Sequence, residues 1–294
     1  MAPPPSYLYT LSFAIALFAT ILVAATLRLL AILPNSRTNT TIGRKKPLAT
    51  RVLIVLGSGG HTREMFYLLK DLDTRKYTHR TYVISSGDAF SAQRAVDFEQ
   101  GLEEREQAKA REKKKKQQEE DGSSADAKIQ ITDADGTTHA RGMEEPRPAY
   151  SGAKHYNIAT VPRARNIHQP LLTTPLSALH CLWKSFDPLL SAPVSHPPTT
   201  SYEAAAADLP NLIITNGPAT AVIMVLASLI LRFFDVKGAN SRGCCKTIYV
   251  ESFARVKTLS LSGKLLLRVV DRFLVQWEEL EAVGGRAEYW GVLV

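Results

Sequence analysis

Short apolar runs recur along the chain and predict the strands of a parallel sheet. Each is five or six residues long, too short for a typical helix, and most are rich in β-branched side chains, as strands buried on both faces are. Most stretches between them are compatible with helices, and this alternation predicts an α/β domain with helices on both faces of the sheet. The predicted strands are 52–56, 81–85, 156–161, 211–215, 247–251 and 272–276.

A much longer apolar segment, residues 7–33, precedes the first strand. It carries a single charge, Arg28, and exceeds the roughly 20 residues that a helix needs to cross a bilayer. The residues before it include no Lys or Arg, which argues against a cleaved signal peptide. Basic residues cluster in 37–51, so the positive-inside rule places the rest of the chain in the cytosol. We expect residues 1–34 to form a transmembrane anchor, with a buried helix of a soluble core as the alternative.

A second apolar run, residues 218–234, is uncharged only up to Leu231. This is too short to cross a bilayer comfortably, and the run directly follows a predicted strand. We expect it to form a buried helix of the α/β domain, and a second membrane span is the alternative.

Residues 99–149 interrupt the alternation with dense mixed charge and few large apolar side chains. Such a segment buries too little surface to offset its ordering entropy, so we expect a disordered insertion whose first half can extend a charged helix. Acidic neighbours nearly cancel the charge of the four lysines at 113–116, which favours a solvated segment over a polybasic binding site. Residues 191–210 look like a second, shorter loop.

The net charge of +8 changes this picture little. The basic residues are scattered and no nucleic-acid-binding motif is present, so we expect no nucleic-acid partner. The cysteines, Cys181, Cys244 and Cys245, form no CxxC pair and no Cys/His metal spacing. We therefore expect a reduced, cytosol-facing domain without a metal or a cofactor.

The first predicted strand opens into "GSGGH", residues 57–61, and a helix-compatible stretch follows. A glycine turn of this kind aims unpaired backbone N–H groups at the carboxyl end of the strand, where phosphate is the natural ligand. The turn is neither of two familiar phosphate loops. Thr62 replaces the third glycine of the dinucleotide fingerprint, and no lysine follows the glycines as in a P-loop. A tight turn without a ligand is the alternative.

Ligands of parallel sheets bind above the carboxyl ends of the strands, so other strand ends join this turn at one edge. Asn216 and Gly217 open a second turn, and Glu251 and Ser252 end a later strand. A buried carboxylate there could orient a sugar hydroxyl, whereas Ser252 acting as a helix N-cap would need no ligand. The nearby cations Arg255 and Lys257 could bind phosphate or remain solvated.

Six segments in order carry a resemblance to a known family: "GSGGHTREM", "NIHQP", "ITNGPATAV", "IYVESFARVKTLSLSGKLL", "DRFLVQW" and "RAEYWGVLV". With the N-terminal anchor, they resemble the family of asparagine-linked glycosylation protein fourteen. That family is the membrane-anchoring subunit of the UDP-N-acetylglucosamine (UDP-GlcNAc) transferase that adds the second GlcNAc to dolichyl-diphosphate-GlcNAc. The resemblance covers nearly all of the chain except the charged insertion and the loop at 191–210.

The resemblance implies a Rossmann-like parallel sheet, the N-terminal half of a GT-B glycosyltransferase, built from residues 50–98 and 150–294. It implies a single-pass protein of the endoplasmic reticulum membrane, with the nuclear envelope as a further site, that recruits a soluble catalytic subunit and is inactive alone. The 18 residues after Gln276 are too few for a donor-binding domain. The alternatives are a pure membrane receptor without substrate contacts and, more weakly, an independent sugar-nucleotide enzyme.

We expect the residues of the strand ends to line the acceptor side of a cleft shared with the catalytic subunit. His61, at the start of a helix, could take the proton of the acceptor hydroxyl or could only bond to its own loop, since the sequence identifies no carboxylate partner. The expected acceptor-binding residues are Gly57, Ser58, Gly59, Gly60, Asn216, Gly217, Glu251 and Ser252.

The C-terminal tail is unusually apolar for a chain end and therefore calls for a burial site. The resemblance implies that it packs into the catalytic subunit, and folding back onto its own sheet is the alternative. The expected partner-binding residues are Tyr289, Trp290, Val292, Leu293 and Val294.

Overall fold

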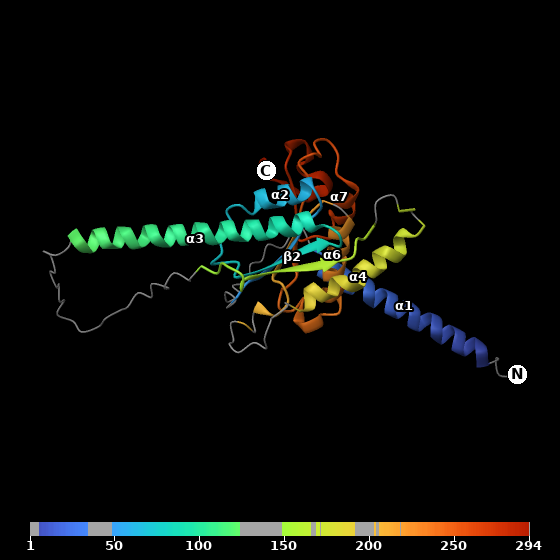
Figure 1. The fold of residues 1–294 in the computed structure, drawn as a ribbon. Coiled ribbons are helices and arrows are strands. Elements are labelled where there is room, and N and C mark those ends of the chain that lie inside the picture. Colours follow the sequence, from blue (N-terminus) through green and yellow to red (C-terminus); the bar gives the residue numbers. More distant parts are fainter. Residues whose placement is uncertain are drawn as a thin grey trace, which may run out of the picture.

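The computed structural model describes residues 6–34, 49–123, 149–165, 169–170, 172–191, 203, 206–217 and 219–293. Within them, seven parallel strands form one sheet in the order β3-β2-β1-β4-β5-β6-β7 (Figure 1). The first six follow the doubly wound Rossmann order, so the predicted fold class is confirmed. The strands are β1 (Arg51–Val55), β2 (His79–Ser85), β3 (Tyr156–Val161), β4 (Leu212–Asn216), β5 (Lys246–Val250), β6 (Arg272–Val275) and β7 (Ala287–Tyr289).

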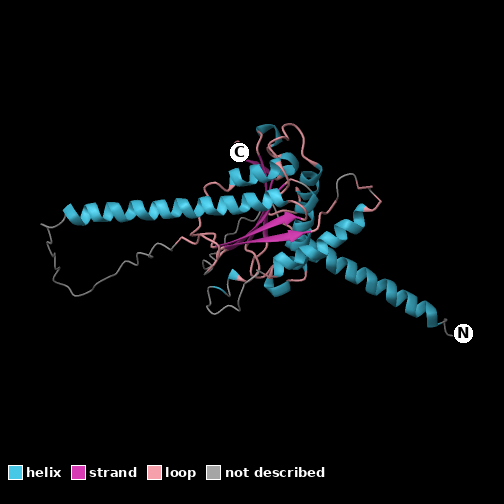
Figure 2. Ribbon diagram, in the orientation of Figure 1, coloured by secondary structure: helices cyan, strands magenta, loops and turns pink. Residues whose placement is uncertain are grey.

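Helices cover both faces of this sheet (Figure 2). The described residues form α1 (Ser6–Ile32), which does not lie on the sheet, and α2 (Gly60–Leu68), α3 (Ala89–Ser123), α4 (Thr174–Leu190), α6 (Ala219–Phe233) and α7 (Leu261–Leu266), with short 3-10 turns η1 (Val236–Gly238), η2 (Glu278–Leu280) and η3 (Val283–Gly285). The six predicted strands all form, each within one or two residues of its predicted bounds. The seventh strand, β7, was not predicted, because its three residues are too few to produce a pattern.

Alternate residues of β1 explain why two layers of helices are needed. Leu53 and Val55 belong to a buried cluster with α4 and α6, whereas Val52 and Ile54 belong to a second cluster with α2 and α3. Because successive side chains of a strand point to opposite faces, an apolar run without alternation must be covered on both sides.

The second apolar run forms α6, which lies inside the domain. Its buried residues include Met224, Val225 and Leu231, and these contact the clusters beneath β1 and β5. The prediction of a buried helix is confirmed for this segment. Arg232, in its last turn, is also buried and forms an ion pair with Asp271 at 3.0 Å.

The N-terminal apolar segment forms α1, which projects away from the sheet (Figure 1). Tyr7–Ile32 is the one helix of the described residues that is long and apolar enough to span a bilayer. Most of its side chains are exposed, so the alternative of a helix buried in a soluble core is wrong. At about 1.5 Å per residue it is long enough to cross the hydrocarbon core of a membrane, which is about 30 Å thick.

The end of α1 is fastened to the end of α6 by two arginines. Arg28 Nε donates to the carbonyl oxygen of Phe233 at 3.0 Å, and Arg232 Nη2 donates to the carbonyl oxygen of Ile32 at 2.9 Å. Each arginine therefore satisfies a carbonyl at the C-terminus of the other helix, where cations are favoured. Arg28, which has the length to snorkel toward the headgroups, instead connects the anchor to the domain.

Part of the charged insertion is helical. α3 starts over the sheet and runs on to Ser123, so residues 99–123 form a helix rather than a disordered segment, as the charged-helix alternative for the first half allowed. Residues 124–148 lie outside the described residues, as do 192–202 and 204–205 of the second loop. The part of α3 that lies over the sheet is joined to β2 by a buried ion pair. In this pair Arg80 Nε lies 2.6 Å from Glu99 Oε1.

Candidate functional site

The glycine turn lies between β1 and α2, at the carboxyl edge of the sheet. Gly57 is buried, whereas Ser58, Gly59 and Gly60 are exposed. Gly59 has a φ of +64° and stands at the N-cap of α2, where no side chain of the described residues provides a capping hydrogen bond. The first N–H groups of α2 therefore face outward at the positive end of the helix dipole, an arrangement that favours an anion.

A buried hydrogen-bond chain supports this turn from below. The hydroxyl of Thr62 donates to the carbonyl oxygen of Gly57 and lies 2.7 Å from the Ser91 hydroxyl. Ser91 in turn donates to Asp88 Oδ2 at 2.8 Å. Thr62, which breaks the dinucleotide fingerprint, thus connects the glycine turn to the next strand-to-helix turn.

His61 is held by the turn that follows β4. The side-chain amide of Asn216 donates to the carbonyl oxygen of His61 at 2.8 Å. A Cβ added to Gly217 would lie 2.7 Å from Cγ of His61, and Gly217 has a φ of +74°, so only glycine fits there. The expected meeting of the β1 and β4 turns at one edge of the sheet is therefore observed.

Glu64 is a residue of this site that the sequence-based prediction missed. Its Oε2 lies 3.4 Å from His61 Nδ1, and its Oε1 accepts a hydrogen bond from the Ser252 hydroxyl at 3.0 Å. Glu64 stands one helical turn after His61, and this spacing of three residues was the available signal. The sequence identified no carboxylate partner for His61, and the structure places Glu64 beside it.

The surroundings of Glu64 favour its ionised form. Partial burial raises its pKa, but hydrogen bonds from His61 and Ser252 outweigh this effect and hold the pKa below its ordinary value. The carboxylate can therefore orient the imidazole of His61 and stabilise it when it carries a proton.

Glu251 and Ser252, which are neighbours in sequence, have different roles. Glu251 is buried, and its Oε2 accepts hydrogen bonds from the backbone N–H and the hydroxyl of Ser260 at 3.1 and 3.0 Å. Ser260, not Ser252, is the N-cap of α7, where it accepts a hydrogen bond from the N–H of Gly263. Glu251 therefore organises the start of α7, whereas Ser252 contacts Glu64 at the edge of the site.

The C-terminal tail divides into two parts. Residues 287–289 form β7, which pairs with β6, so the alternative of folding back onto the sheet is observed for Tyr289. Trp290 and Val292 beyond it are 58% and 54% exposed. Arg272 lies over the ring of Trp290, 4.4 Å from its centroid. Leu293 is half-buried, and Val294 lies outside the described residues.

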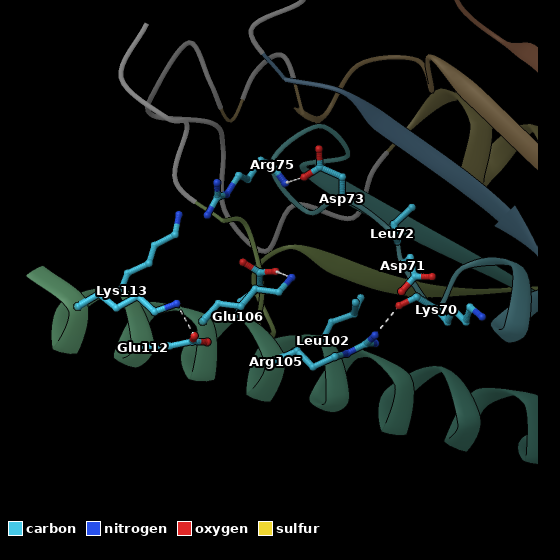
Figure 3. Close-up of a pocket in the computed structure, with 12 residues that line it drawn as sticks. Lys70, Asp71, Leu72, Asp73, Arg75, Leu102, Arg105, Glu106, Glu112 and Lys113 are labelled. Carbon is cyan, nitrogen blue, oxygen red and sulfur yellow. Dashed lines mark hydrogen bonds and ion pairs between the residues drawn. The ribbon is translucent and has the colours of Figure 1, made fainter. Parts of the chain in front are cut away.

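A separate charged groove lies between the loop after α2 and the outer part of α3 (Figure 3). Its cations and carboxylates largely neutralise one another, for example in the exposed pair of Lys116 and Glu112 at 2.8 Å. The groove lies near the opposite end of α2 from the glycine turn, and it contains none of the predicted site residues. We assign it no part in the site.

The described residues contain no group of three or more His, Cys, Asp and Glu that could hold a metal ion. The three cysteines, all buried, are free thiols. At the carboxyl edge, the backbone N–H groups of the glycine turn, His61 and the Glu64 carboxylate suit anion binding and proton transfer.

Comparison with known proteins gives consistent matches along most of the chain. The model of the family described as "Oligosaccharide biosynthesis protein Alg14 like" matches residues 52–293. The UDP-N-acetylglucosamine transferase subunit alg14 of Aspergillus fumigatus is 38% identical over 269 residues, covering 78% of this chain and 100% of that protein. Its Schizosaccharomyces pombe counterpart is 34% identical, with 92% and 95% covered, and the Homo sapiens subunit ALG14 is 30% identical, with 83% and 82% covered.

One solved structure, the crystal structure of Acinetobacter baumannii MurG, was also matched. The TM-score is 0.38 with 9% sequence identity, and the match covers 78% of this chain. This chain spans 41% of that longer one.

Proposed function

Because the chain belongs to the family of Alg14-like oligosaccharide biosynthesis proteins, we propose that it is the membrane-anchored subunit of a UDP-GlcNAc transferase. In this proposal the complex adds the second GlcNAc to dolichyl-diphosphate-GlcNAc. The chain anchors the soluble catalytic subunit to the endoplasmic reticulum membrane, with its domain on the cytosolic side, and contributes the acceptor side of the cleft. Alone it is inactive.

One observation carries the acceptor role: the direction of the anchor relative to the sheet. In Figure 2 the strand arrows point toward the side on which α1 leaves the domain. The carboxyl edge, with the glycine turn and His61, therefore lies on the side of the domain from which α1 projects, which supports an edge that faces the bilayer in this proposal. A lipid-linked diphosphate held in that bilayer would present its phosphates to the outward N–H groups of α2, which supports an acceptor site at this edge.

The residues of the site support a defined division of the reaction. A hydroxyl of the acceptor sugar attacks the anomeric carbon of the donor, the bond from that carbon to the UDP oxygen breaks, and UDP leaves with the electron pair. His61 takes the proton of the attacking hydroxyl, and Glu64 orients the imidazole and stabilises its charge. The catalytic subunit supplies the donor site.

The test is a bulky residue in the glycine turn of the assembled complex. A Cβ at Gly60 would meet no atom within 4 Å, so the first atom of a new side chain has room there, and we expect the indole of Gly60→Trp to cover the outward N–H groups of the turn. Gly101→Trp is the matched control, because Gly101 is equally unobstructed but lies on α3. We expect Gly60→Trp to lower GlcNAc transfer at least tenfold, roughly 1.4 kcal/mol, while the control stays normal. Normal transfer by both variants, with normal assembly, would instead support a pure receptor.

A further inference from the structure

Two aromatic side chains, Phe253 and Trp277, stack on each other at the carboxyl edge of the sheet. Phe253 lies shortly after β5 and Trp277 shortly after β6, so the pair joins two neighbouring strand ends. The ring centroids are 5.0 Å apart, and the ring planes are inclined by 36°. Phe253 is 39% exposed and Trp277 is half-buried, so the indole supports a phenyl ring that remains accessible from outside.

Hydrogen bonds hold this pair in one position. Nε1 of Trp277 donates to the carbonyl oxygen of Phe253 at 2.6 Å. The preceding side chain, Gln276, is buried and donates through Nε2 to the carbonyl oxygen of Glu251 at 3.0 Å. Two successive residues at the end of β6 thus fasten the segment that follows β5. The phenyl ring is therefore preorganised, and a ligand that stacks on it does not have to order a loose loop.

The same segment contacts the carboxylate of the candidate site. The Ser252 hydroxyl donates to Glu64 Oε1 at 3.0 Å, and the backbone N–H of Phe253 also donates to Glu64. The other oxygen of this carboxylate, Oε2, lies 3.4 Å from Nδ1 of His61. A single carboxylate thus separates the backbone of Phe253 from the imidazole. A sugar that presents a hydroxyl to His61 is therefore large enough to reach the Phe253 segment as well.

The chemistry of the acceptor sugar suits an aromatic surface. In GlcNAc the substituents on the ring carbons from C2 to C5 are all equatorial, so the axial C–H groups form an apolar face on each side of the ring. An aromatic ring binds such a face, while neighbouring polar groups fix the hydroxyls. The glycine turn and His61 offer polar groups to the acceptor, whereas Phe253 offers an apolar surface beside them.

We propose that the exposed ring of Phe253, supported by Trp277, stacks on the GlcNAc ring of the lipid-linked acceptor. This inference rests on the proposed function and adds a sugar subsite beside the phosphate site of the glycine turn. A sugar is favoured over a protein partner as the occupant, because Phe253 contacts the same carboxylate that orients His61. Phe253 thereby distinguishes a glycosylated lipid diphosphate from a bare one, and Trp277 is the positioning residue that holds it.

Equilibrium binding to the assembled complex in detergent, without the sugar donor, tests this proposal. The two probes are short-chain analogues of dolichyl-diphosphate-GlcNAc and of dolichyl diphosphate, which differ only in the sugar. We expect the parent complex to prefer the first probe, and Phe253→Leu to reduce this preference about tenfold with unchanged affinity for the second. Phe253→Tyr keeps the ring and should keep the preference. Phe234→Leu is the matched control, because Phe234 is 71% exposed and packs on Phe233 at 5.0 Å but follows α6.

An undiminished preference in Phe253→Leu would overturn the proposal. Equal binding of both probes by the parent complex would also overturn it, but would leave the phosphate site and the proposed function standing, whereas binding of neither probe would contradict both. Loss of the catalytic subunit from Phe253→Leu would make the ring a partner contact instead. If Phe253→Leu does not fold, Trp277→Phe removes only the N–H that holds Phe253. The proposal requires that variant to lose part of the preference, and an unchanged preference would contradict it.

Discussion

His61 is positioned by contacts from two segments of the chain, the turn after β4 and its own helix α2. Asn216 donates to its carbonyl oxygen, Gly217 leaves room for its ring, and Glu64 lies beside its Nδ1. Ser252 from a third segment contacts Glu64 in turn. The imidazole is therefore oriented before any ligand binds, as a general base needs to be.

Replacing Glu64 tests the importance of this orientation. Glu64→Gln keeps the size of the side chain and removes its charge, so we expect the kcat of the assembled transferase to fall about tenfold with little change in the acceptor KM. Steady-state kinetics with a dolichyl-diphosphate-GlcNAc analogue provide the measurement, and thermal melting monitors the fold. An unchanged kcat would remove Glu64 from the mechanism.

His79 gives the domain a sensitivity to acid. Burial, followed by the charges of His155 and Arg80, lowers the pKa of His79 from 6.5 to about 4. The unfolded chain therefore binds a proton that the folded chain resists, and stability is lost as the pH falls from about 6.5 toward about 4. We expect the melting temperature of His79→Gln to drop less between pH 7 and pH 5 than that of the parent. An equal drop in both would assign the acid sensitivity to other groups.

At the scale of elements, the anchor and the domain form a continuous unit. The ends of α1 and α6 are joined by the exchange of Arg28 and Arg232, and Arg286 donates to the carbonyl oxygen of Pro34 at 3.0 Å. We expect removal of residues 1–34 to release the domain from membranes and also to delete these contacts. The contacts of Ile32 and Pro34 indicate that a cut before Arg28 preserves the domain better than a cut after residue 34.

Asp271 offers an internal comparison of two ion pairs at this junction. Arg232 contacts it from a buried position, with a side chain 4% exposed, whereas Lys246 contacts it with a side chain 47% exposed. We expect Arg232→Met to reduce the free energy of unfolding by about 3 kcal/mol, because the Asp271 carboxylate, only 13% exposed, loses its buried partner. Lys246→Met should cost less than about 1 kcal/mol. Denaturant titrations in detergent compare the two, and equal losses would show that burial does not govern this pair.

At the scale of the whole molecule, the proposed partner contact lies next to the end of the proposed membrane anchor. The C-terminal tail follows β7 at the edge of the sheet, and Arg286, just before β7, donates to the carbonyl oxygen of Pro34, just after α1. The end of α1 and Trp290 line the same groove. A soluble subunit bound to the tail would therefore lie close to the end of the proposed anchor.

Deleting residues 290–294 tests the partner contact without removing β7. The exposed side chains of Trp290 and Val292 are lost, while the backbone pairing of Tyr289 with β6 is kept. An aromatic anchor commonly contributes about 2 kcal/mol, so we expect affinity for the catalytic subunit to fall by a factor of roughly 30. Co-purification from membranes provides the measurement. A normal yield of the soluble subunit with a folded truncated chain would place the interface elsewhere.

The amino-acid sequence by itself determined the elements of this protein and their class. The apolar runs that became β1 and α6 and the long segment that became α1 are all local patterns, because length and periodicity decide how much surface each can bury. The glycine turn at 57–60 and the turn at Asn216 were predicted for the same reason, since the residues of a turn lie next to the strand that they end.

Only the tertiary structure decided which of these residues meet and what they contact. The strand order places the turns of β1, β4 and β5 side by side, which brings Ser252 to Glu64 and Asn216 to His61. It also places the Glu251 carboxylate against Ser260 and pairs residues 287–289 of the tail with β6. These contacts join residues far apart in the chain, and no local period encodes them, because they depend on how helices and strands pack around one core.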